Sequence, residues 1–433
     1  MSSNEWRRQL DLGGSVHLMG AGGMGMAGLA ALLYARGLKV SGCDLQLGRQ
    51  TEALERLGIP VEVGHDPAHV EGSDLLIYST AVDMNSAEIE VAKGRGIPVI
   101  QRGVALAECM KSRQTIVVAG SHGKTSTAAI LAQLLDSGYV IGGEIQGEEL
   151  LAKDGERMVV EVDESDGTAV HFVSDYTIIT NVDDDHLEHH GSSQALDDCF
   201  RTLIQQTKRK VFYFADDKRS AALCRGRENC CPIEINETAT CVPFPGKYNI
   251  RNAAAALQVA QEFMALDRCV KRLRNVRPVR RRFETVIECG GVRVITDYAH
   301  HPAEIGSLFE AAKGLESERL KVIFQPHRYT RTRAFANEFA AVLAVADEVW
   351  VSPVYAASEV PIIGGCSADL VSVCKDKGFK HVNEVDSLEE AWQKVAPYVE
   401  KGDLLLLVGA GDVDLLRDRV MEIEQILACK VSD

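Results

Sequence analysis

The sequence predicts an α/β protein built from three parallel-sheet units. Apolar strand-like runs alternate with helical patterns along the whole chain, which is typical of βαβ architecture. Gly-rich turns follow the first strand of each of the first two units. The length of 433 residues exceeds one ordinary domain. We expect domains over residues 1–113, 114–278 and 279–433.

Composition favours a soluble globular protein, with 46% hydrophobic and 25% charged residues. A formal net charge of -15 argues against nucleic acid or an anionic membrane surface as a partner. The first residues do not resemble a signal peptide, and no apolar run reaches the roughly 18 residues of a membrane helix. The twelve cysteines include no C-x-x-C pair. We therefore expect a cytoplasmic protein with reduced thiols.

The first unit is predicted to contain four strands and an early helix. The strands are Ser15–Met19, Lys39–Gly42, Leu75–Ser79 and Pro98–Ile100, and the helix is Met24–Ala35. The turn Gly20–Gly25 between the first strand and the helix suits anion binding at a helix N-terminus, and Asp44 could meet a ribose hydroxyl. Tight packing of the helix on the strand could equally require these glycines.

The second unit opens with a candidate phosphate-binding loop. A strand at Thr115–Val118 leads into Gly120-Ser-His-Gly-Lys-Thr125, and a helix at Ala128–Leu135 follows. Glycines let several N–H groups point at one phosphate, and Lys124 could reach the terminal phosphates. The alternative is a Gly-rich turn that caps an ordinary helix, with a solvated lysine.

Two further strands of this unit, Met158–Val162 and Tyr176–Asn181, each end in polar clusters. Glu164 and His186 lie in these clusters, and their side chains are suitable ligands for a divalent cation. The alternative is that Glu164 caps a helix and His186 is a surface histidine. Downstream, Lys218–Ile235 is expected to be a surface excursion. Asn249 and Asn252 near the start of the helix Tyr248–Phe263 could bond an adenine edge or cap the helix.

The third unit follows the basic boundary Arg274–Arg282. Its predicted strands are Val292–Thr296, Leu320–Phe324, Glu348–Ser352 and Leu404–Val408, and its helices include Pro302–Lys313, Arg333–Leu343 and Leu388–Val399. The segments Asp297–Pro302 and Gln325–Arg333 follow two of these strands and carry His, Asp and Arg side chains. They indicate a second anion-binding face, or helix caps and solvated arginines.

Taken in order, the motifs of the chain resemble those of the Mur ligase family over nearly the whole length. The matching segments are Gly20–Gly25, Ser41–Asp44, Gly64–His65, Gly120–Thr125, Asp163–Asp166, Thr180–Val182, Asp185–His186, Pro245–Asn252, Arg281–Phe283, Asp297–Pro302, Phe324–Thr332, Val354–Ala357 and Gly409–Gly411. The resemblance implies a Rossmann-like N-terminal domain for a UDP-sugar, a P-loop central domain for ATP, and a Rossmann-like C-terminal domain that closes over an amino acid.

The resemblance also implies a reaction. The lactyl carboxylate of UDP-N-acetylmuramate attacks the γ-phosphate of ATP, and the amine of L-alanine attacks the resulting acyl phosphate, in peptidoglycan precursor synthesis. The segments around His327 and Tyr355 favour the family member that acts first. We expect these small molecules as partners, no nucleic acid or membrane, and a monomer or dimer.

The family's functional positions fall on residues of this sequence. Catalytic roles are implied for Lys124, Glu164, His186, His301 and Arg328, and Mg²⁺ binding for Thr125, Glu164 and His186. The implied ATP site consists of Gly120, Ser121, His122, Gly123, Lys124, Thr125, Ser126, Asn249, Asn252, Arg282 and Asp297. Substrate binding is implied for Gly22, Gly23, Asp44 and His65 on the UDP-sugar side and for Arg328 on the amino-acid side.

The sequence departs from the family pattern at a few points. Ser121 stands where the family usually has Thr, Tyr248 where it usually has His, and two segments of the central domain look shorter than usual. Three alternatives remain open on the sequence: a recycling ligase that adds a tripeptide to the same sugar nucleotide, an inactive nucleotide-binding module, and a dinucleotide oxidoreductase suggested by Gly20–Gly25 and Asp44.

Overall fold

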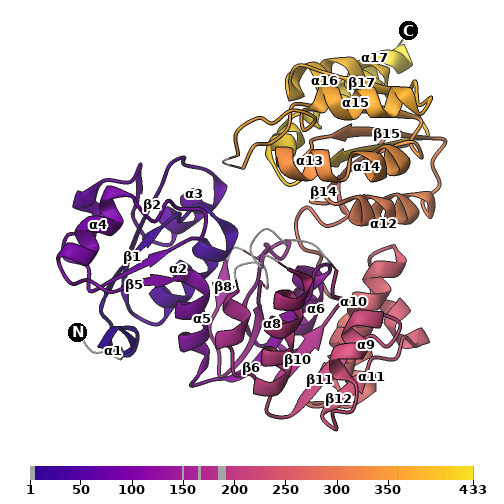
Figure 1. Ribbon diagram of the computed structural model, residues 1–433. Helices are drawn as coiled ribbons and strands as arrows, with labels where there is room; N and C mark the ends of the chain where they lie inside the picture. The colour runs from indigo at the N-terminus through magenta and orange to yellow at the C-terminus, as the bar shows by residue number, and fades with distance from the viewer. Residues whose placement is uncertain (1–4, 149–150, 164–166, 184–191, 358, 433) are drawn as a thin grey trace. The chain divides into compact units, whose positions relative to one another are not determined.

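The chain forms three β-sheets flanked by helices, as the computed structural model shows (Figure 1). The structure describes residues 5–148, 151–163, 167–183, 192–357 and 359–432. Two compact units divide the chain: Met1–Pro243 with Ile250–Val279, and Phe244–Asn249 with Arg280–Asp433. The first unit holds two of the sheets and the second unit holds one, and each unit is described by itself.

The first sheet is entirely parallel. Its order is β3 (Val61–Val63), β2 (Lys39–Asp44), β1 (Ser15–Met19), β4 (Leu75–Tyr78) and β5 (Val99–Gln101). Side chains alternate across a strand, so Val16 and Leu18 join one core cluster while Met19 joins another on the opposite face. The first face is covered by α2 (Met24–Ala35), α3 (Arg49–Arg56) and α5 (Arg102–Met110), and the second by α4 (Ala87–Gly94) and η1 (Pro67–Val70). The helix α1 (Glu5–Leu12) precedes β1.

The second sheet places the strand before the phosphate loop between two strands that carry polar residues at their ends. Its order is β12 (Cys230–Pro232), β11 (Lys210–Tyr213), β10 (Tyr176–Ile179), β6 (Gln114–Ala119), β9 (Arg157–Glu161), β7 (Gly138–Val140) and β8 (Ala152–Lys153). All pairs are parallel except β7 with β8. Its helical segments are α6 (Lys124–Leu135), η2 (Thr168–His171), α8 (Ser193–Gln206), α9 (Lys218–Cys224), η3 (Glu237–Cys241), α10 (Lys247–Ala260) and α11 (Leu266–Leu273).

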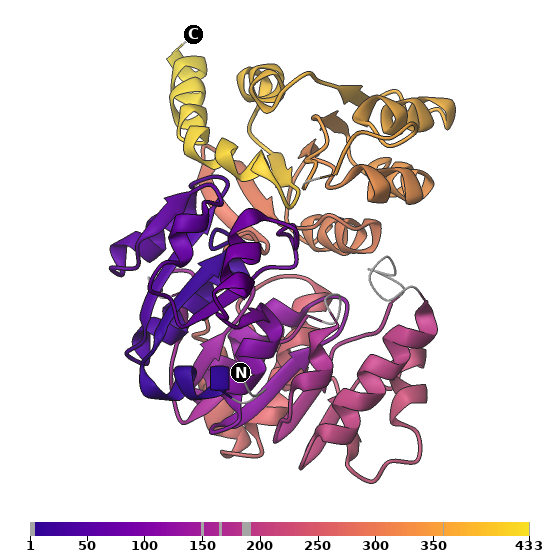
Figure 2. The same ribbon diagram turned by 60° about the vertical axis from the view of Figure 1, so that its left-hand side comes forward.

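The third sheet has helices on both faces. Its order is β13 (Glu284–Cys289), β14 (Val292–Asp297), β18 (Asp403–Val408), β15 (Arg319–Phe324), β16 (Glu348–Val351) and β17 (Val382–Glu384), with only β13 and β14 antiparallel. One face packs on α12 (Pro302–Lys313), α14 (Ala336–Leu343) and α15 (Ser367–Asp376). The other packs on α16 (Leu388–Val395), η4 (Ala396–Tyr398), η5 (Asp412–Arg419) and α17 (Glu422–Ser432), the C-terminal helix in Figure 2.

These sheets confirm the predicted α/β fold, and two local predictions are wrong. The segment Lys218–Ile235 is not a surface excursion, because it supplies α9 and the edge strand β12. A three-residue edge strand is too short to show a period in sequence. The predicted helix Arg333–Leu343 is two helices, α13 (Tyr329–Ala334) and α14, because Phe335 leaves helical geometry at φ -113° and ψ 23°.

Candidate functional site

Two positions in the loop between β6 and α6 require glycine. Gly120 has a φ of +127°, and a Cβ there would lie 2.2 Å from the Thr180 hydroxyl oxygen. Gly123 has a φ of +80°, and its Cβ would lie 2.6 Å from Oδ1 of Asn252. A side chain would therefore be strained and would collide at both positions. The loop is pressed against the end of β10 on one side and against α10 on the other.

Asn181, which follows β10, fixes the path of this loop. The backbone N–H groups of Ser121 and His122 donate to its carbonyl oxygen (3.1 Å) and to its Oδ1 (2.8 Å). Its Nδ2 donates to the His122 carbonyl (3.0 Å). The Ser121 hydroxyl accepts from the backbone N–H of Asp183 at 2.8 Å. With the loop start held this way, the N–H groups of the first turn of α6 are the donors that an anion would meet.

Thr125 and Lys124, the first residues of α6, have different surroundings. The Thr125 side chain is buried, and its hydroxyl donates to Oε1 of Glu161 at 3.0 Å. Oε2 of Glu161 accepts from the backbone N–H of Gly142 at 2.6 Å. Lys124 folds back so that Nζ lies 3.3 Å from the Ser121 carbonyl oxygen. Glu161 was missed by the sequence analysis, although a carboxylate at the last position of an apolar strand was a usable signal.

The two asparagines predicted for the nucleotide have different partners. Oδ1 of Asn252 accepts from the Thr127 hydroxyl at 3.2 Å, which places this buried side chain directly against the phosphate loop. Nδ2 of Asn249 donates to the Pro245 carbonyl at 2.7 Å, at the start of α10. This bond is not an N-cap, because the side chain donates to a carbonyl and Asn249 lies inside the first turn of α10.

The first Gly-rich turn is closed by Asp44. The N–H groups of Gly20 and Ala21 both donate to the Cys43 carbonyl, and the N–H of Gly22 donates to Oδ2 of Asp44 at 2.9 Å. A Cβ on Gly22 would lie 2.9 Å from the same oxygen. Nδ1 of His65, two residues after β3, lies 3.2 Å from the Cys43 thiol. Gly22, Asp44 and His65 thus follow or end β1, β2 and β3 at their carboxyl ends, where ligands bind in such sheets.

In the second unit, Asp297 ends β14 and holds two backbone segments. Its Oδ2 accepts from the Phe283 N–H at 2.7 Å and its Oδ1 from the Ala299 N–H at 2.8 Å. Burial raises the pKa of Asp297 to about 6, although Arg282 and the two N–H donors act in the opposite direction. The guanidinium of Arg282 lies over the Tyr298 ring, 5.2 Å from its centre.

The segment after β15 is tied to Tyr355. The Arg328 N–H donates to the Tyr355 carbonyl and the Tyr355 N–H to the Pro326 carbonyl, both at 2.8 Å. The His327 and Tyr355 rings stack with centres 5.5 Å apart. Arg328 adopts a φ of +68°, an uncommon backbone conformation for a side chain of this size.

Three histidines lie in the segments that follow β14 and β15. The His300 and His327 rings lie 5.5 Å apart. Burial lowers the pKa of His300 to about 4, and burial followed by His300 lowers the pKa of His327 to about 3, so both rings are neutral at pH 7. His301 caps α12 and stacks edge-on against Phe335, with centres 4.7 Å apart. The structure thus gathers the predicted residues Arg282, Asp297, His301 and Arg328 at the carboxyl ends of β14 and β15.

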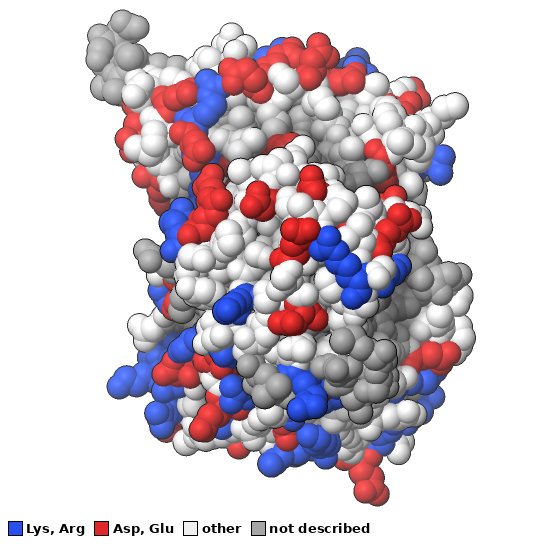
Figure 3. Space-filling view, turned by 90° about the vertical axis from the view of Figure 1, so that its left-hand side faces the viewer, with Lys and Arg blue, Asp and Glu red and all other residues white. Residues whose placement is uncertain are grey.

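Two predicted metal and catalytic residues, Glu164 and His186, lie outside the described residues. Within the described part of the chain, no helix is long and apolar enough to cross a membrane. On the face shown in Figure 3, Lys and Arg side chains are interspersed with Asp and Glu.

Comparison with known proteins places the whole chain in one family. Models described as parts of Mur ligases match the chain: the catalytic domain over residues 15–114, the middle domain over 118–233, and the glutamate ligase domain over 281–411. Two similar curated proteins are named UDP-N-acetylmuramate–L-alanine ligase. The one from Kineococcus radiotolerans is 39% identical, with 95% of this chain and 96% of the relative covered. The one from Agrobacterium fabrum is 34% identical, with 92% and 94% covered.

A solved structure supports the same relationship. The crystal structure of UDP-N-acetylmuramate–alanine ligase from Thermotoga maritima matches with a TM-score of 0.82 at 28% identity, and covers 95% of this chain and 99% of that one.

Proposed function

The chain belongs to the Mur ligase family, and we propose that it is an ADP-forming ligase that joins L-alanine to the lactyl carboxylate of UDP-N-acetylmuramate in peptidoglycan precursor synthesis. The observation that carries the proposal is the likeness over almost the full length to curated ligases of that name. The cytoplasm is the compartment we propose, with a monomer or dimer as the assembly.

The reaction consists of two substitutions. An oxygen of the lactyl carboxylate forms a bond to the γ-phosphorus of ATP, and the bond from that phosphorus to the β–γ bridging oxygen breaks, which releases ADP. The amine nitrogen of L-alanine then attacks the acyl carbon, and inorganic phosphate leaves as the amine loses its proton. Such phosphoryl transfer depends on positioning and charge neutralisation.

The phosphate loop is the part of the chain that would meet ATP. Gly120 and Gly123 keep the backbone close to the ligand, the start of α6 supplies N–H donors, and Lys124 supplies a positive charge. We also assign ATP binding to Ser121, His122, Ser126, Asn249 and Asn252. The same role is assigned to Arg282 and Asp297.

Hydroxyl and carboxylate oxygens and an imidazole nitrogen are suitable ligands for a divalent cation. We assign Mg²⁺ to Thr125, Glu164 and His186, where it would neutralise phosphate charge. The Thr125 hydroxyl is held at the first turn of α6 by Glu161, which supports this assignment.

The substrates are assigned to the two remaining sheets. Contacts to the UDP-sugar are assigned to Gly22, Gly23, Asp44 and His65. The support is that these residues lie at the carboxyl ends of strands of the first sheet. His301 and Arg328 would act on the amino-acid side, where an arginine fork suits a carboxylate.

Substrate-dependent ADP release tests this function. ADP should form only when ATP, UDP-N-acetylmuramate and L-alanine are all present, and omission of any one should abolish it. A tripeptide supplied in place of L-alanine should give no ADP, and turnover with the tripeptide alone would instead indicate the recycling ligase. ATP binding without turnover on any amino acid would overturn the proposal in favour of an inactive nucleotide-binding module.

A further inference from the structure

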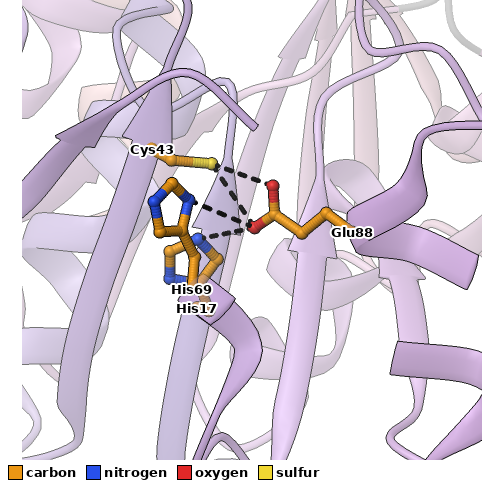
Figure 4. A group of neighbouring side chains, drawn as sticks. All are labelled: His17, Cys43, His69 and Glu88. Atoms are coloured by element: carbon orange, nitrogen blue, oxygen red, sulfur yellow. Dashed lines mark hydrogen bonds and ion pairs between the residues drawn. The ribbon is translucent and has the colours of Figure 1, made fainter. Parts of the chain in front are cut away.

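Four potential metal ligands converge beneath the first sheet, on the face covered by α4 and η1 (Figure 4). They come from four different elements: His17 from β1, Cys43 from β2, His69 from η1 and Glu88 from α4. The figure shows the thiol and both imidazoles turned toward the Glu88 carboxylate. We refer to these four side chains as the His–Cys–Glu cluster.

Strand alternation explains how the cluster forms. Val16 and Leu18 face α2, so His17 between them faces the opposite side, together with Met19 and Cys43. Apolar side chains of α4 and η1 pack on this same face. The helix α4 thereby carries Glu88 into the interior, where its side chain is 0% exposed.

The donor atoms have the spacing of a coordination shell. All four lie within 4.8 Å of one another. Oε1 of Glu88 lies 3.0 Å from His17 Nε2, 3.5 Å from Cys43 Sγ and 3.9 Å from His69 Nδ1. A tetrahedron with Zn–N bonds of about 2.0–2.1 Å and a Zn–S bond of about 2.3 Å has edges of about 3.3–3.6 Å. Small side-chain movements would therefore bring the four atoms onto one ion.

His17 provides an independent indication of a ligand. Its side chain is 1% exposed, and its Nδ1 is fixed by the Ser41 hydroxyl at 2.8 Å. Its Nε2 is aimed into the cluster, where Oε1 of Glu88 lies 3.0 Å away without the geometry of a hydrogen bond. A bond from the second ring nitrogen to a neighbouring group is the usual support of a metal-ligating histidine.

The buried charge of Glu88 also indicates a bound cation. A buried carboxylate is normally paired with a cation or bound to a metal. The ion-pair partners found for Glu88 among the described residues are His17, His65 and His69, with no lysine or arginine. A divalent cation would supply the missing positive charge for Glu88 and for a Cys43 thiolate.

A cavity borders two of the four side chains of the cluster. This cavity of about 430 Å³ is lined in part by His17 and His69 and also by the carboxylates of Glu62 and Asp66. The His69 side chain is 12% exposed, so it borders this opening. The two acidic residues that line this cavity favour a cation over an anion.

We propose that the His–Cys–Glu cluster is a structural site for a zinc-type divalent cation, separate from the ATP site. Two imidazoles, one thiolate and one carboxylate fill a tetrahedron with borderline-soft ligands, which selects Zn²⁺ over Mg²⁺ or Ca²⁺. The ion would join the ends of β1 and β2 to α4 and η1, directly behind the Asp44 turn.

Cobalt substitution tests this site without reference to activity. Full-length protein stripped with a chelator and titrated with Co²⁺ should bind one equivalent that shows d–d absorption and a thiolate-to-cobalt charge-transfer band. Zn²⁺ should displace it. The thiolate band also distinguishes this site from the ATP site, since Thr125, Glu164 and His186 include no sulfur.

Matched variants identify the cysteine that gives the thiolate-to-cobalt band. Cys43→Ser should abolish it, and His69→Gln, at the rim of the cluster, should weaken Co²⁺ binding at least about tenfold. Cys374→Ser, at a buried thiol of the second unit, should leave both unchanged. Absence of a thiolate band in the wild-type protein, or its survival in Cys43→Ser, would overturn the proposal. If Cys43→Ser does not fold, the wild-type spectrum and His69→Gln decide it.

Discussion

The Thr125 hydroxyl donates a hydrogen bond to Oε1 of Glu161 at 3.0 Å, which joins the first turn of α6 to the last residue of β9. The other oxygen of Glu161 accepts from the Gly142 N–H. The side chain that we assign to Mg²⁺ is therefore positioned by a carboxylate that the sequence motifs did not single out.

Glu161→Gln should raise the Mg²⁺ concentration needed for half-maximal turnover by about tenfold, since an outer-shell partner of a metal ligand typically has that effect. An amide can accept with only one of its two polar ends, so either the Thr125 hydroxyl or the Gly142 N–H loses its acceptor. Mg²⁺ titration of turnover measures the shift. Glu156→Gln, at an exposed position before β9, is the control, and an unchanged Mg²⁺ dependence in Glu161→Gln would show that Glu161 has no such role.

Lys124→Ala should lower turnover by about a hundredfold or more, because it removes a preorganised positive charge from the transferring phosphoryl group. Thermal denaturation of the variant should accompany the kinetics, so that a loss of turnover is not mistaken for a loss of folding. Steady-state kinetics with an exposed-lysine control, Lys208→Ala, gives the comparison. Turnover close to the wild-type value would mean that the loop does not hold ATP.

Gly123→Ala should destabilise the first unit by roughly 2–3 kcal/mol, from its positive φ and from the collision with Asn252 together. Gly167→Ala is a matched control, because Gly167 has a φ of +70° but no atom within 4 Å of the added Cβ. That variant should lose only about 1 kcal/mol. Chemical denaturation measures both, and equal losses would show that the Asn252 contact is not restrictive.

Acid should destabilise the second unit through His300. Its pKa is lowered to about 4, so between pH 6.5 and 4 the unfolded chain binds more protons than the folded one. The stability that depends on a neutral His300 ring is fully present above pH 6.5 and is lost as the pH falls toward 4. The stability difference between wild type and His300→Gln should therefore shrink by about 2 kcal/mol between pH 7.5 and pH 5.

Denaturation of both proteins at the two pH values checks this. The raised pKa of Asp297 changes stability with pH in the opposite direction. Because Asp297 is present in both proteins, its effect cancels when the stability of His300→Gln is subtracted from that of the wild type. His171→Gln, at an exposed position, is the histidine control. A pH-independent difference for His300→Gln would contradict neutral burial of this ring.

The central strands could be predicted from sequence because each is a short apolar run bounded by turn residues. The strands β3, β7, β8, β11, β13 and β17 were not predicted. Two elements have the same bounds in the structure as in the prediction: the strand Ser15–Met19 and the helix Pro302–Lys313. The break at Phe335 could not be predicted, since it involves one residue inside a continuous helical pattern. The short edge strand β12 lacked enough residues to show a period.

Site residues could be predicted only where they belong to a recognisable sequence motif. The loop residues Gly120 and Gly123 occupy positions that demand glycine, as a phosphate loop requires. Glu161 belongs to none of the motifs, and its place at the end of an apolar strand was the only signal for it in the sequence. The His–Cys–Glu cluster could not be found, because His17 and Glu88 are 71 positions apart and no metal-binding spacing relates them. Roles for Glu164 and His186 and the three domain bounds stay predictions.

Product analysis with labelled substrate tests the central claim most directly. UDP-N-acetylmuramate carrying ¹⁸O in both lactyl carboxylate oxygens should be incubated with ATP and L-alanine, and both products examined by mass spectrometry. We predict UDP-N-acetylmuramoyl-L-alanine with one ¹⁸O retained, and inorganic phosphate carrying the other. ADP formation without the alanyl product, or phosphate free of label, would contradict the account.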